Sequence, residues 1–385
     1  MASSRIEGRS SPSPEMNVTR RLLVSSVDFG FGAAGKLLSI LRHMTDAELV
    51  VLGSELLRQV QETGGVLWGA RWVDRLEDVD LRTIDAALVV LDPLLADRLT
   101  AAGTPVVYVD SLPHMWSDAD PICERVFSYC AQRYKVGLTE PPQALAGVKA
   151  FKWVDPLAPI SGTGGDRLPM TAVVNVGGVH SPFSVGNDRS PYVEVVVAPA
   201  VEALTRLGYT TVVTGNVDER TAEELRPKDV GCGVVEHERF VNLLHRTDLL
   251  LTSPGMTTMM EAGRAGIDTV LLPPQNLSQI VNADVMTGGR PCSRIDWPAE
   301  WFPYDAVEAA REHGEEAALE LIYESIATIR AKPEASGWLT TTVQAHIRAR
   351  SSWLKHAVVG LDRDGAREVA DEVAAAVLWS RGRTV

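Results

Sequence analysis

Closely spaced cysteine pairs are absent from this 385-residue chain. None of its cysteines stands as C-x-x-C; they are Cys123, Cys130, Cys232 and Cys292. That spacing indicates neither a zinc knuckle nor a dithiol redox pair. Scattered single cysteines are typical of a reducing compartment, where a buried thiol behaves as a small apolar residue. We therefore expect a cytoplasmic protein that requires no metal.

Long apolar runs and an excess of positive charge are also absent. No run approaches the ~20 apolar residues of a membrane-spanning helix. The net charge of −13 argues against a broad surface for nucleic acid, so we expect small molecules as partners. Residues 1–16 lack the apolar core of a signal peptide and contain IEGR, a protease tetrapeptide. We expect them to be a disordered tag or leader.

Short β-branched runs alternate with helical patterns along the rest of the chain, which predicts parallel α/β sheets. A Pro- and Gly-rich segment, 139–169, interrupts this rhythm as a linker would. The length predicts two domains, which we expect at 17–155 and 165–335. The remaining residues, 336–385, are expected to be helices, the last of which crosses back to the first domain.

The strongest functional signal lies in the second half, over residues 249–284. Parallel sheets bind ligands at the carboxyl ends of their strands. Here a predicted strand ends at Ser253 and Gly255, and a helix opens with small hydroxyl residues, an arrangement suited to a diphosphate. Glu261 lies one turn further along the helix, where its carboxylate could accept hydrogen bonds from the two hydroxyls of a ribose. The expected donor-binding residues of this segment are Ser253, Gly255, Met256, Thr257, Thr258, Glu261 and Gln279.

This segment resembles the donor-binding half of GT-B glycosyltransferases. Their pattern is G-x-x-T-x-x-E-a-x-x-x-G-x-P, then a strand, then P-x-x-x-D-Q-x-x-N-A. The chain matches it at Gly255, Thr258, Glu261, Ala262, Gly266, Pro273, Gln279, Asn282 and Ala283, and departs from it at Asp268 and Ser278. The resemblance covers about 165–290. It implies two Rossmann-like domains facing across a cleft, and a UDP-sugar as co-substrate without a further cofactor.

Two loops of the family have counterparts here. The segment 173–183 supplies Gly177, Gly178 and His180 toward the donor, where glycine lets the backbone approach phosphate. The first loop after a strand supplies Asp28, which the resemblance suggests as the base that deprotonates the acceptor. A turn or helix-capping role for Asp28 stays open. Expected acceptor contacts beside it are Phe29, Gly30, Phe31 and Gly32.

A second acceptor-side cluster follows a strand in VDSLPHMWSDADP, residues 109–121. Trp116 is expected to stack on a planar acceptor, and Asp110 or His114 to hydrogen-bond it or act as the base. The alternative is a partly buried Trp with solvated neighbours.

A narrower resemblance rests on VDSLPHMWSDADP, FKWVDPLAP and VVNVGGVHSPF. Together these segments are similar to the cytosylglucuronate synthase type of enzyme from nucleoside-antibiotic pathways. That similarity implies transfer of glucuronate from UDP-glucuronate to cytosine or hydroxymethylcytosine. The carboxylate of such a donor would be met by Lys36, Arg189 or Arg290.

The same glycine segment also fits two other nucleotide motifs. Gly30, Gly32 and Gly35 spell G-x-G-x-x-G, and Glu55 stands near the end of the next strand, as in an NAD-dependent oxidoreductase. With Lys36 they spell a Walker A loop that has Leu37 in place of the hydroxyl residue, with Asp92 as its strand-end acid. A UDP-sugar epimerase or hydrolase of the same fold and a non-enzymatic sugar-binding protein stay open. The stereochemistry of transfer, inverting or retaining, also stays open, and so does the oligomeric state, for which a homodimer is possible.

Overall fold

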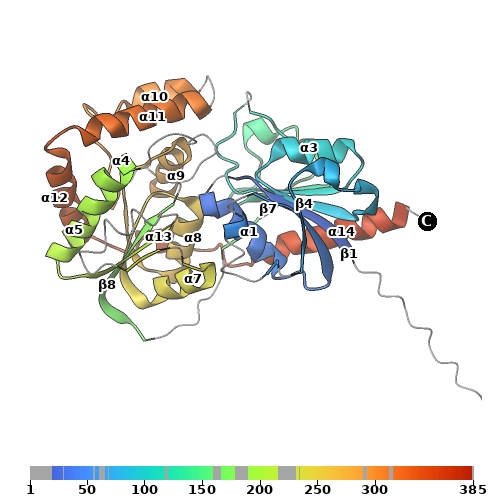
Figure 1. Ribbon diagram of the computed structural model, residues 1–385, viewed down its shortest axis with the longest axis horizontal. Helices are drawn as coiled ribbons and strands as arrows, with labels where there is room; N and C mark the ends of the chain where they lie inside the picture. Colours follow the sequence, from blue (N-terminus) through green and yellow to red (C-terminus); the bar gives the residue numbers. More distant parts are fainter. Residues whose placement is uncertain are drawn as a thin grey trace, which may run out of the picture.

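The computed structural model describes two parallel sheets, each with helices on both faces (Figure 1). The described residues are 20–28, 30–54, 57–59, 66–67, 69–117, 120–158, 166–177, 190–215, 231–233, 235–288, 293–311 and 315–383. None of the helices among them combines the length and the apolar character that crossing a bilayer requires.

The first sheet has seven parallel strands in the order β3-β2-β1-β4-β5-β6-β7. Its central strands are buried on both sides, which is why they appear in the sequence as continuous apolar runs. Helix α1 covers one face and α3 the other. The bounds are β1 Arg20–Ser26, α1 Gly30–Leu41, β2 Ala47–Leu52, β3 Arg71–Val73, β4 Ala86–Val90, α3 Pro93–Ala101, β5 Val106–Asp110, β6 Ser128–Gln132 and β7 Phe151–Val154.

The second sheet has five parallel strands in the order β10-β9-β8-β11-β12. Its strands are β8 Leu168–Val176, β9 Thr210–Gly215, β10 Gly231–Gly233, β11 Thr247–Thr252 and β12 Asp268–Leu271. A π-helical stretch, Val193–Val197, joins α4 to α5. The helices are α4 Ser190–Tyr192, α5 Ala198–Arg206, α7 His237–Arg246, α8 Met256–Ala265, α9 Leu277–Thr287, α10 Tyr304–Arg311, α11 Glu315–Arg330, α12 Ala335–Arg348 and α13 Trp353–Val358.

The last helix, α14 (Gly365–Arg383), leaves the second domain and packs on the first sheet (Figure 1). Val369, Val373 and Val377 are buried in the same core as β1, β4 and α1. Its start is anchored by Asp155, whose carboxylate accepts the backbone N–H of Arg363 at 3.0 Å and pairs with Arg133 at 3.1 Å. The chain therefore closes the first domain with its final segment.

Two strands of the first sheet do not follow from the sequence patterns. β7 lies inside 139–169, the segment expected to be a linker. Its neighbour β6 supplies the pairing that makes this stretch a strand, through a register that matches Tyr129 with Phe151. β3 is only three residues long and is formed by pairing to β2. Both strands depend on a partner rather than on a pattern of their own.

The fit of α14 predicts the effect of one substitution. A Cβ on Gly365 would overlap the backbone carbonyl of Asp155, which cannot move aside as a flexible side chain would. We expect Gly365→Ala to lower the free energy of unfolding by about 1–3 kcal/mol, measured by urea denaturation. Gly382→Ala, in the same helix with no atom within 4 Å, is the control and should be neutral or slightly stabilising. Equal effects of the two substitutions would contradict this packing.

Candidate functional site

The start of α8, at the carboxyl edge of the second sheet, is open in the sense that no described side chain caps it. β11 ends at Thr252, and Gly255 stands at the N-cap in an extended conformation, with φ −78° and ψ 125°. Glycine has no side chain with which to cap the helix, and none of the other described side chains takes that role. The N–H groups of the first turn therefore present the positive end of the helix dipole to an incoming anion.

The end of β8 is tied to this turn through Gly177. The Gly177 N–H donates to Ser253 Oγ at 3.0 Å, and that hydroxyl donates back to the Gly177 carbonyl at 3.0 Å. Gln279 Nε2 also donates to the Gly177 carbonyl, at 2.9 Å. Three of the predicted donor-binding residues are thus held together by hydrogen bonds to one another, which fixes the backbone beside α8.

Ser278 occupies the position where the family pattern has Asp. Its hydroxyl donates at 2.9 Å to Asn276 Oδ1, which also caps α9 by accepting the Gln279 N–H at 3.0 Å. Ser278 is buried in this cap. A side chain used in this way shapes the helix start and brings no carboxylate to the site.

Glu261 lies on α8 facing α7, and only 3% of its surface is exposed. Its Oε1 is 2.5 Å from Nε2 of His237, the first residue of α7. Burial lowers the pKa of His237, but the adjacent Glu261 carboxylate outweighs burial, so the pKa is raised overall and the imidazolium is favoured. Sequence reasoning missed His237, although it follows β10 at the carboxyl edge of the sheet.

Lys36 reaches the same place from the first domain. It lies on α1, is 3% exposed, and its Nζ donates to Thr257 Oγ1 in the first turn of α8. A second, long contact of 3.4 Å runs to the Gly32 carbonyl. Burial lowers the pKa of Lys36 to about 8, against the opposing effects of the Glu261 and Asp110 carboxylates. An ammonium group is thus enclosed where the two domains meet.

The glycine segment before Lys36 is helical, and the expectation of a loop there was wrong. α1 begins at Gly30, so Gly32 and Gly35 lie within the helix. A Cβ on Gly32 would stand 3.4 Å from Thr257 Oγ1, so glycine lets α1 approach α8 closely. A Walker A motif needs a loop that wraps phosphate, and none is formed here. Asp92, its supposed companion, caps α3 by accepting the Leu95 N–H at 2.9 Å.

Asp110 is a fully buried carboxylate that organises the loop after β5. It accepts hydrogen bonds from the Leu112 N–H at 2.8 Å, Trp116 Nε1 at 2.7 Å and the Tyr129 hydroxyl at 2.8 Å. Burial raises its pKa to about 6, although these donors and Lys36 oppose the shift. Asp110 and Trp116, predicted on the acceptor side, are therefore bound to each other.

His114 joins the two domains. Its Nε2 is 2.9 Å from Oδ1 of Asn282 on α9, and its ring lies 4.6 Å from that of Tyr134, centroid to centroid. Asn282 donates its amide to the Pro254 carbonyl at 3.3 Å, so its oxygen faces His114 and accepts the Nε2 proton. Burial lowers the pKa of His114 to about 4, so the imidazole is neutral at neutral pH.

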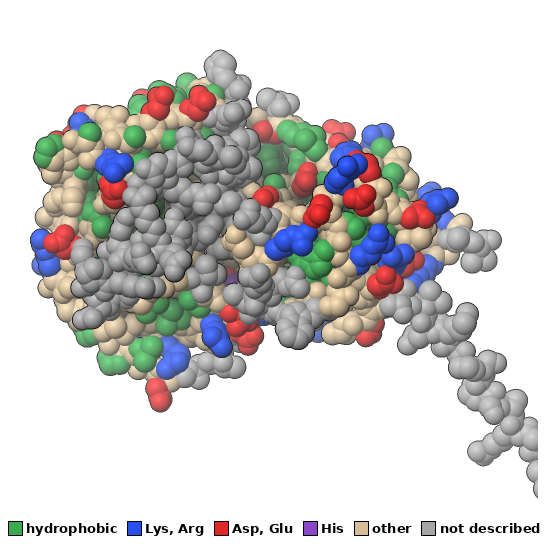
Figure 2. Space-filling model, viewed as in Figure 1, with side chains coloured by type: hydrophobic (Ala, Val, Ile, Leu, Met, Phe, Trp, Pro, Cys, Tyr) green, Lys and Arg blue, Asp and Glu red, His purple; other side chains and the backbone are tan. Residues whose placement is uncertain are grey.

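Asp28 lines a cavity of about 540 Å³ at the carboxyl edge of the first sheet. The cavity is bounded by the ends of β1 and β2 and by the start of α3, with Ser26 and Asp92 among its walls. Charged side chains around it are paired, as Arg58 with Asp74 at 2.5 Å. Figure 2 shows acidic and basic side chains interspersed over this domain, at the right of the view.

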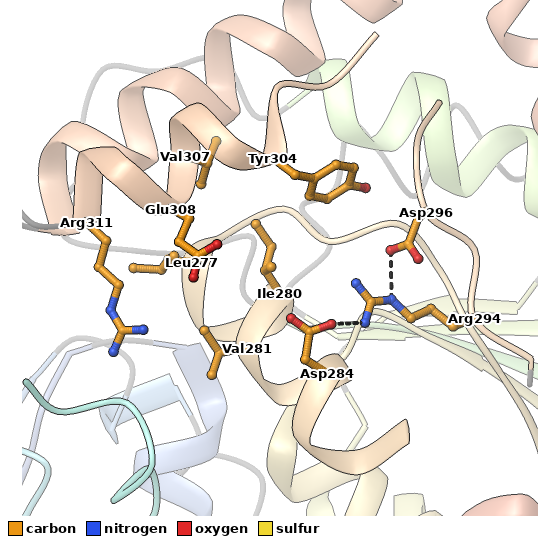
Figure 3. A pocket seen from close by; sticks show the side chains of 10 residues that line it. All are labelled: Leu277, Ile280, Val281, Asp284, Arg294, Asp296, Tyr304, Val307, Glu308 and Arg311. Atoms are coloured by element: carbon orange, nitrogen blue, oxygen red, sulfur yellow. Dashed lines mark hydrogen bonds and ion pairs between the residues drawn. The ribbon is translucent and has the colours of Figure 1, made fainter. Parts of the chain in front are cut away.

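A second cavity, of about 330 Å³, lies between α9 and α10 (Figure 3). Arg294 stands between Asp284 and Asp296 on one side, and Arg311 lies on the other. Arg311 also donates to the Met115 carbonyl of the first domain. No predicted site residue lines this cavity. Arg294 is paired with two carboxylates, and Arg311 is bonded to a backbone carbonyl.

Several predicted contacts lie outside what the structure describes. Phe29, Gly178, His180, Arg189 and Arg290 are not described, and neither is Glu55; for Gly30 and Phe31 only the helical backbone is. Within the described ranges, no three His, Cys, Asp or Glu side chains gather as metal ligands would.

Two parallel-sheet α/β domains with this connectivity form a GT-B fold. The chain is similar to UGT89C1 of Arabidopsis thaliana complexed with UDP, with a TM-score of 0.51 and 12% identity over 93% of this chain and 99% of that one. A UDP-glucosyltransferase from Polygonum tinctorium gives a TM-score of 0.49, at 12% identity over 93% and 99% of the two chains. The calicheamicin glycosyltransferase CalG4 gives 0.48, at 14% identity over 94% and 98%.

No protein-family model matches the chain, and no curated protein matches it in sequence. At these identities the likeness to solved structures establishes the fold, while the chemistry has to be argued from the site.

The partly buried His114 predicts an acid-sensitive contact between the domains. Because its pKa is lower in the folded protein than in the unfolded chain, stability falls as the pH drops from 6.5 toward 4. Between pH 7 and pH 5 this one group should remove about 2 kcal/mol from the free energy of unfolding. Urea titrations at the two pH values measure the free energy of unfolding. We expect its fall from pH 7 to pH 5 to be about 2 kcal/mol smaller in His114→Gln than in wild type. His356→Gln, at an exposed position, is the control and should follow wild type.

Proposed function

We propose that this protein is a glycosyltransferase that moves a sugar from a UDP-sugar to a small acceptor. One observation carries the proposal: the open start of α8 lies at the carboxyl edge of the second sheet and against the first domain, within a GT-B fold. A helix start without a side-chain cap is suited to a diphosphate. The position at the domain boundary gives the donor access to groups of both domains.

The donor half of the site is supported by its hydrogen-bond groups. The first-turn N–H groups of α8 would donate hydrogen bonds to the diphosphate, and the hydrogen-bonded backbone at Gly177 would lie beside it. Glu261 would accept a hydrogen bond from a ribose hydroxyl with the carboxylate oxygen that does not face His237. This assignment uses the protein's own donors and acceptors and requires no metal or further cofactor.

Among the three candidate bases, Asp28 is the one that the geometry favours. Asp110 is fully buried, and His114 is partly buried at the contact between the domains. Asp28 lines a cavity large enough for a small acceptor. It would take the acceptor proton as the acceptor attacks the anomeric carbon, while the bond to the UDP oxygen breaks and UDP leaves.

The narrower proposal, glucuronate transfer to cytosine or hydroxymethylcytosine, rests on the resemblance of three sequence segments. The described walls of the Asp28 cavity hold no aromatic ring. We propose that a flat acceptor stacks on Trp116, which is partly exposed. Phe29 and Phe31 remain predicted acceptor contacts whose side chains lie outside the described part of the chain.

The activity is tested by UDP release. Purified protein is incubated with UDP-glucuronate, with and without cytosine, and UDP is measured by a coupled assay. We expect release that depends on cytosine, and we expect Asp28→Asn to reduce it by about 10²–10⁴-fold with UDP affinity unchanged. Asp74→Asn, a carboxylate at the rim of the same cavity, is the matched control and should keep most of the activity.

Three outcomes would count against parts of this proposal. Release without any acceptor would indicate a hydrolase or epimerase of the same fold. Thermal stabilisation by NAD alone, and not by UDP, would contradict the nucleotide-sugar assignment. Full activity of Asp28→Asn would show that another group is the base.

A further inference from the structure

The charge of Lys36 has no directly bonded counter-ion among the described residues. Its ammonium contacts two oxygens, Thr257 Oγ1 and the more distant Gly32 carbonyl, both neutral. The two carboxylates that act on it electrostatically, Glu261 and Asp110, are bound to other donors. A buried charge without a bonded partner of opposite sign is costly, and such a group is usually paired.

The position of this ammonium group adds to the electrostatic cost of burying its charge. Thr257 belongs to the first turn of α8, where the helix dipole carries positive partial charge. Lysine is favoured at the opposite end of a helix, so its placement here is electrostatically unfavourable in the ligand-free protein. Lys36 and the open start of α8 are therefore two positive features that face each other in a buried place.

The packing of α1 maintains this arrangement. Gly32 lies one helical turn before Lys36, and a Cβ there would stand 3.4 Å from Thr257 Oγ1 and 3.7 Å from Lys36 Nζ. A larger side chain would crowd both groups. Leu37, the next residue, is fully buried in the core of the first domain, so α1 cannot easily rotate Lys36 away.

We propose that Lys36 is the cation that binds the diphosphate of the donor, reaching it from the first domain while α8 binds it from the second. This inference rests on the proposed function, because it assigns a residue to the same nucleotide-sugar site. A diphosphate supplies the negative charge that both Lys36 and the helix start lack. The ligand then joins the two domains, so donor binding and the closeness of the domains depend on each other.

This role separates Lys36 from a residue that only holds the domains together. Lysine as a phosphate ligand acts as a point charge, so its contribution should follow the charge of the ligand. Uridine carries no phosphate and should be bound equally well with or without Lys36. UDP should bind less well when Lys36 is replaced. Inorganic pyrophosphate should also bind less well if Lys36 recognises the diphosphate and no other part of the ligand.

The test compares Lys36→Met with wild type by isothermal titration calorimetry at pH 7. We expect the affinity for UDP to fall about 10- to 100-fold, as for lost hydrogen bonds to a charged group, and the affinity for uridine to change less than about twofold. Lys149→Met, at an exposed lysine of the same domain, is the matched control and should leave both affinities unchanged.

A stability measurement shows whether the variant is folded and supplies an independent readout. Removing a buried charge that lacks a counter-ion should raise the Tm of the ligand-free protein, by about 2–4 °C. Stabilisation together with loss of UDP binding is the combination that this role predicts. A lower Tm with a parallel loss of UDP and uridine would instead show a structural role and overturn the inference.

The remaining outcomes are also decisive. Unchanged UDP affinity in Lys36→Met would refute the role of Lys36 and leave the proposed function intact. If wild type bound pyrophosphate through Lys36 but did not bind UDP, the anion site would stand and the nucleotide assignment would fail. Failure of wild type to bind either ligand would contradict both.

Discussion

The ammonium of Lys36, enclosed against the start of α8, is the constraint on which the rest of the site depends. It places a charge of the first domain beside the helix start of the second domain, where we propose that the diphosphate binds. Neither positive feature is balanced by a bonded carboxylate of the described protein. In this account the ligand completes the electrostatics, and the empty protein carries a cost of the kind that functional sites commonly impose on stability.

The two carboxylates that act electrostatically on Lys36 are bonded to other donors. Glu261 is bound to His237, and Asp110 is held by Trp116 and Tyr129. The domains are joined by contacts elsewhere, through neutral pairs such as His114 with Asn282 and through the helix α14 on the first sheet. The boundary between the domains is thus fixed at several points, while no described carboxylate bonds directly to Lys36.

Much of the fold follows from the sequence, because buried parallel strands appear as apolar runs between helical patterns. The two parallel α/β halves were predicted in this way. The GT-B fold was predicted from the resemblance of residues 165–290 to that family, and the turn before α8 from Gly255 and the spacing to Glu261. Tertiary pairing decided the rest. β7 exists because β6 pairs with it. The glycines before Lys36 are helical. The hydrogen bond from Lys36 on α1 to Thr257 on α8 joins residues 221 positions apart, and no local pattern reveals it.

Proton uptake on UDP binding tests the central claim most directly. The pKa of Lys36 in the free protein is about 8, so at pH 9 the amine is mostly neutral, and a bound diphosphate should raise that pKa and protonate it. The phosphates of UDP are already ionised at this pH, since their last pKa is about 6. Calorimetry in buffers of different ionisation enthalpy should show uptake rising from about 0.1 proton at pH 7 to about 0.5 at pH 8 and more at pH 9. Absence of uptake in wild type, or equal uptake in Lys36→Met, would contradict the account.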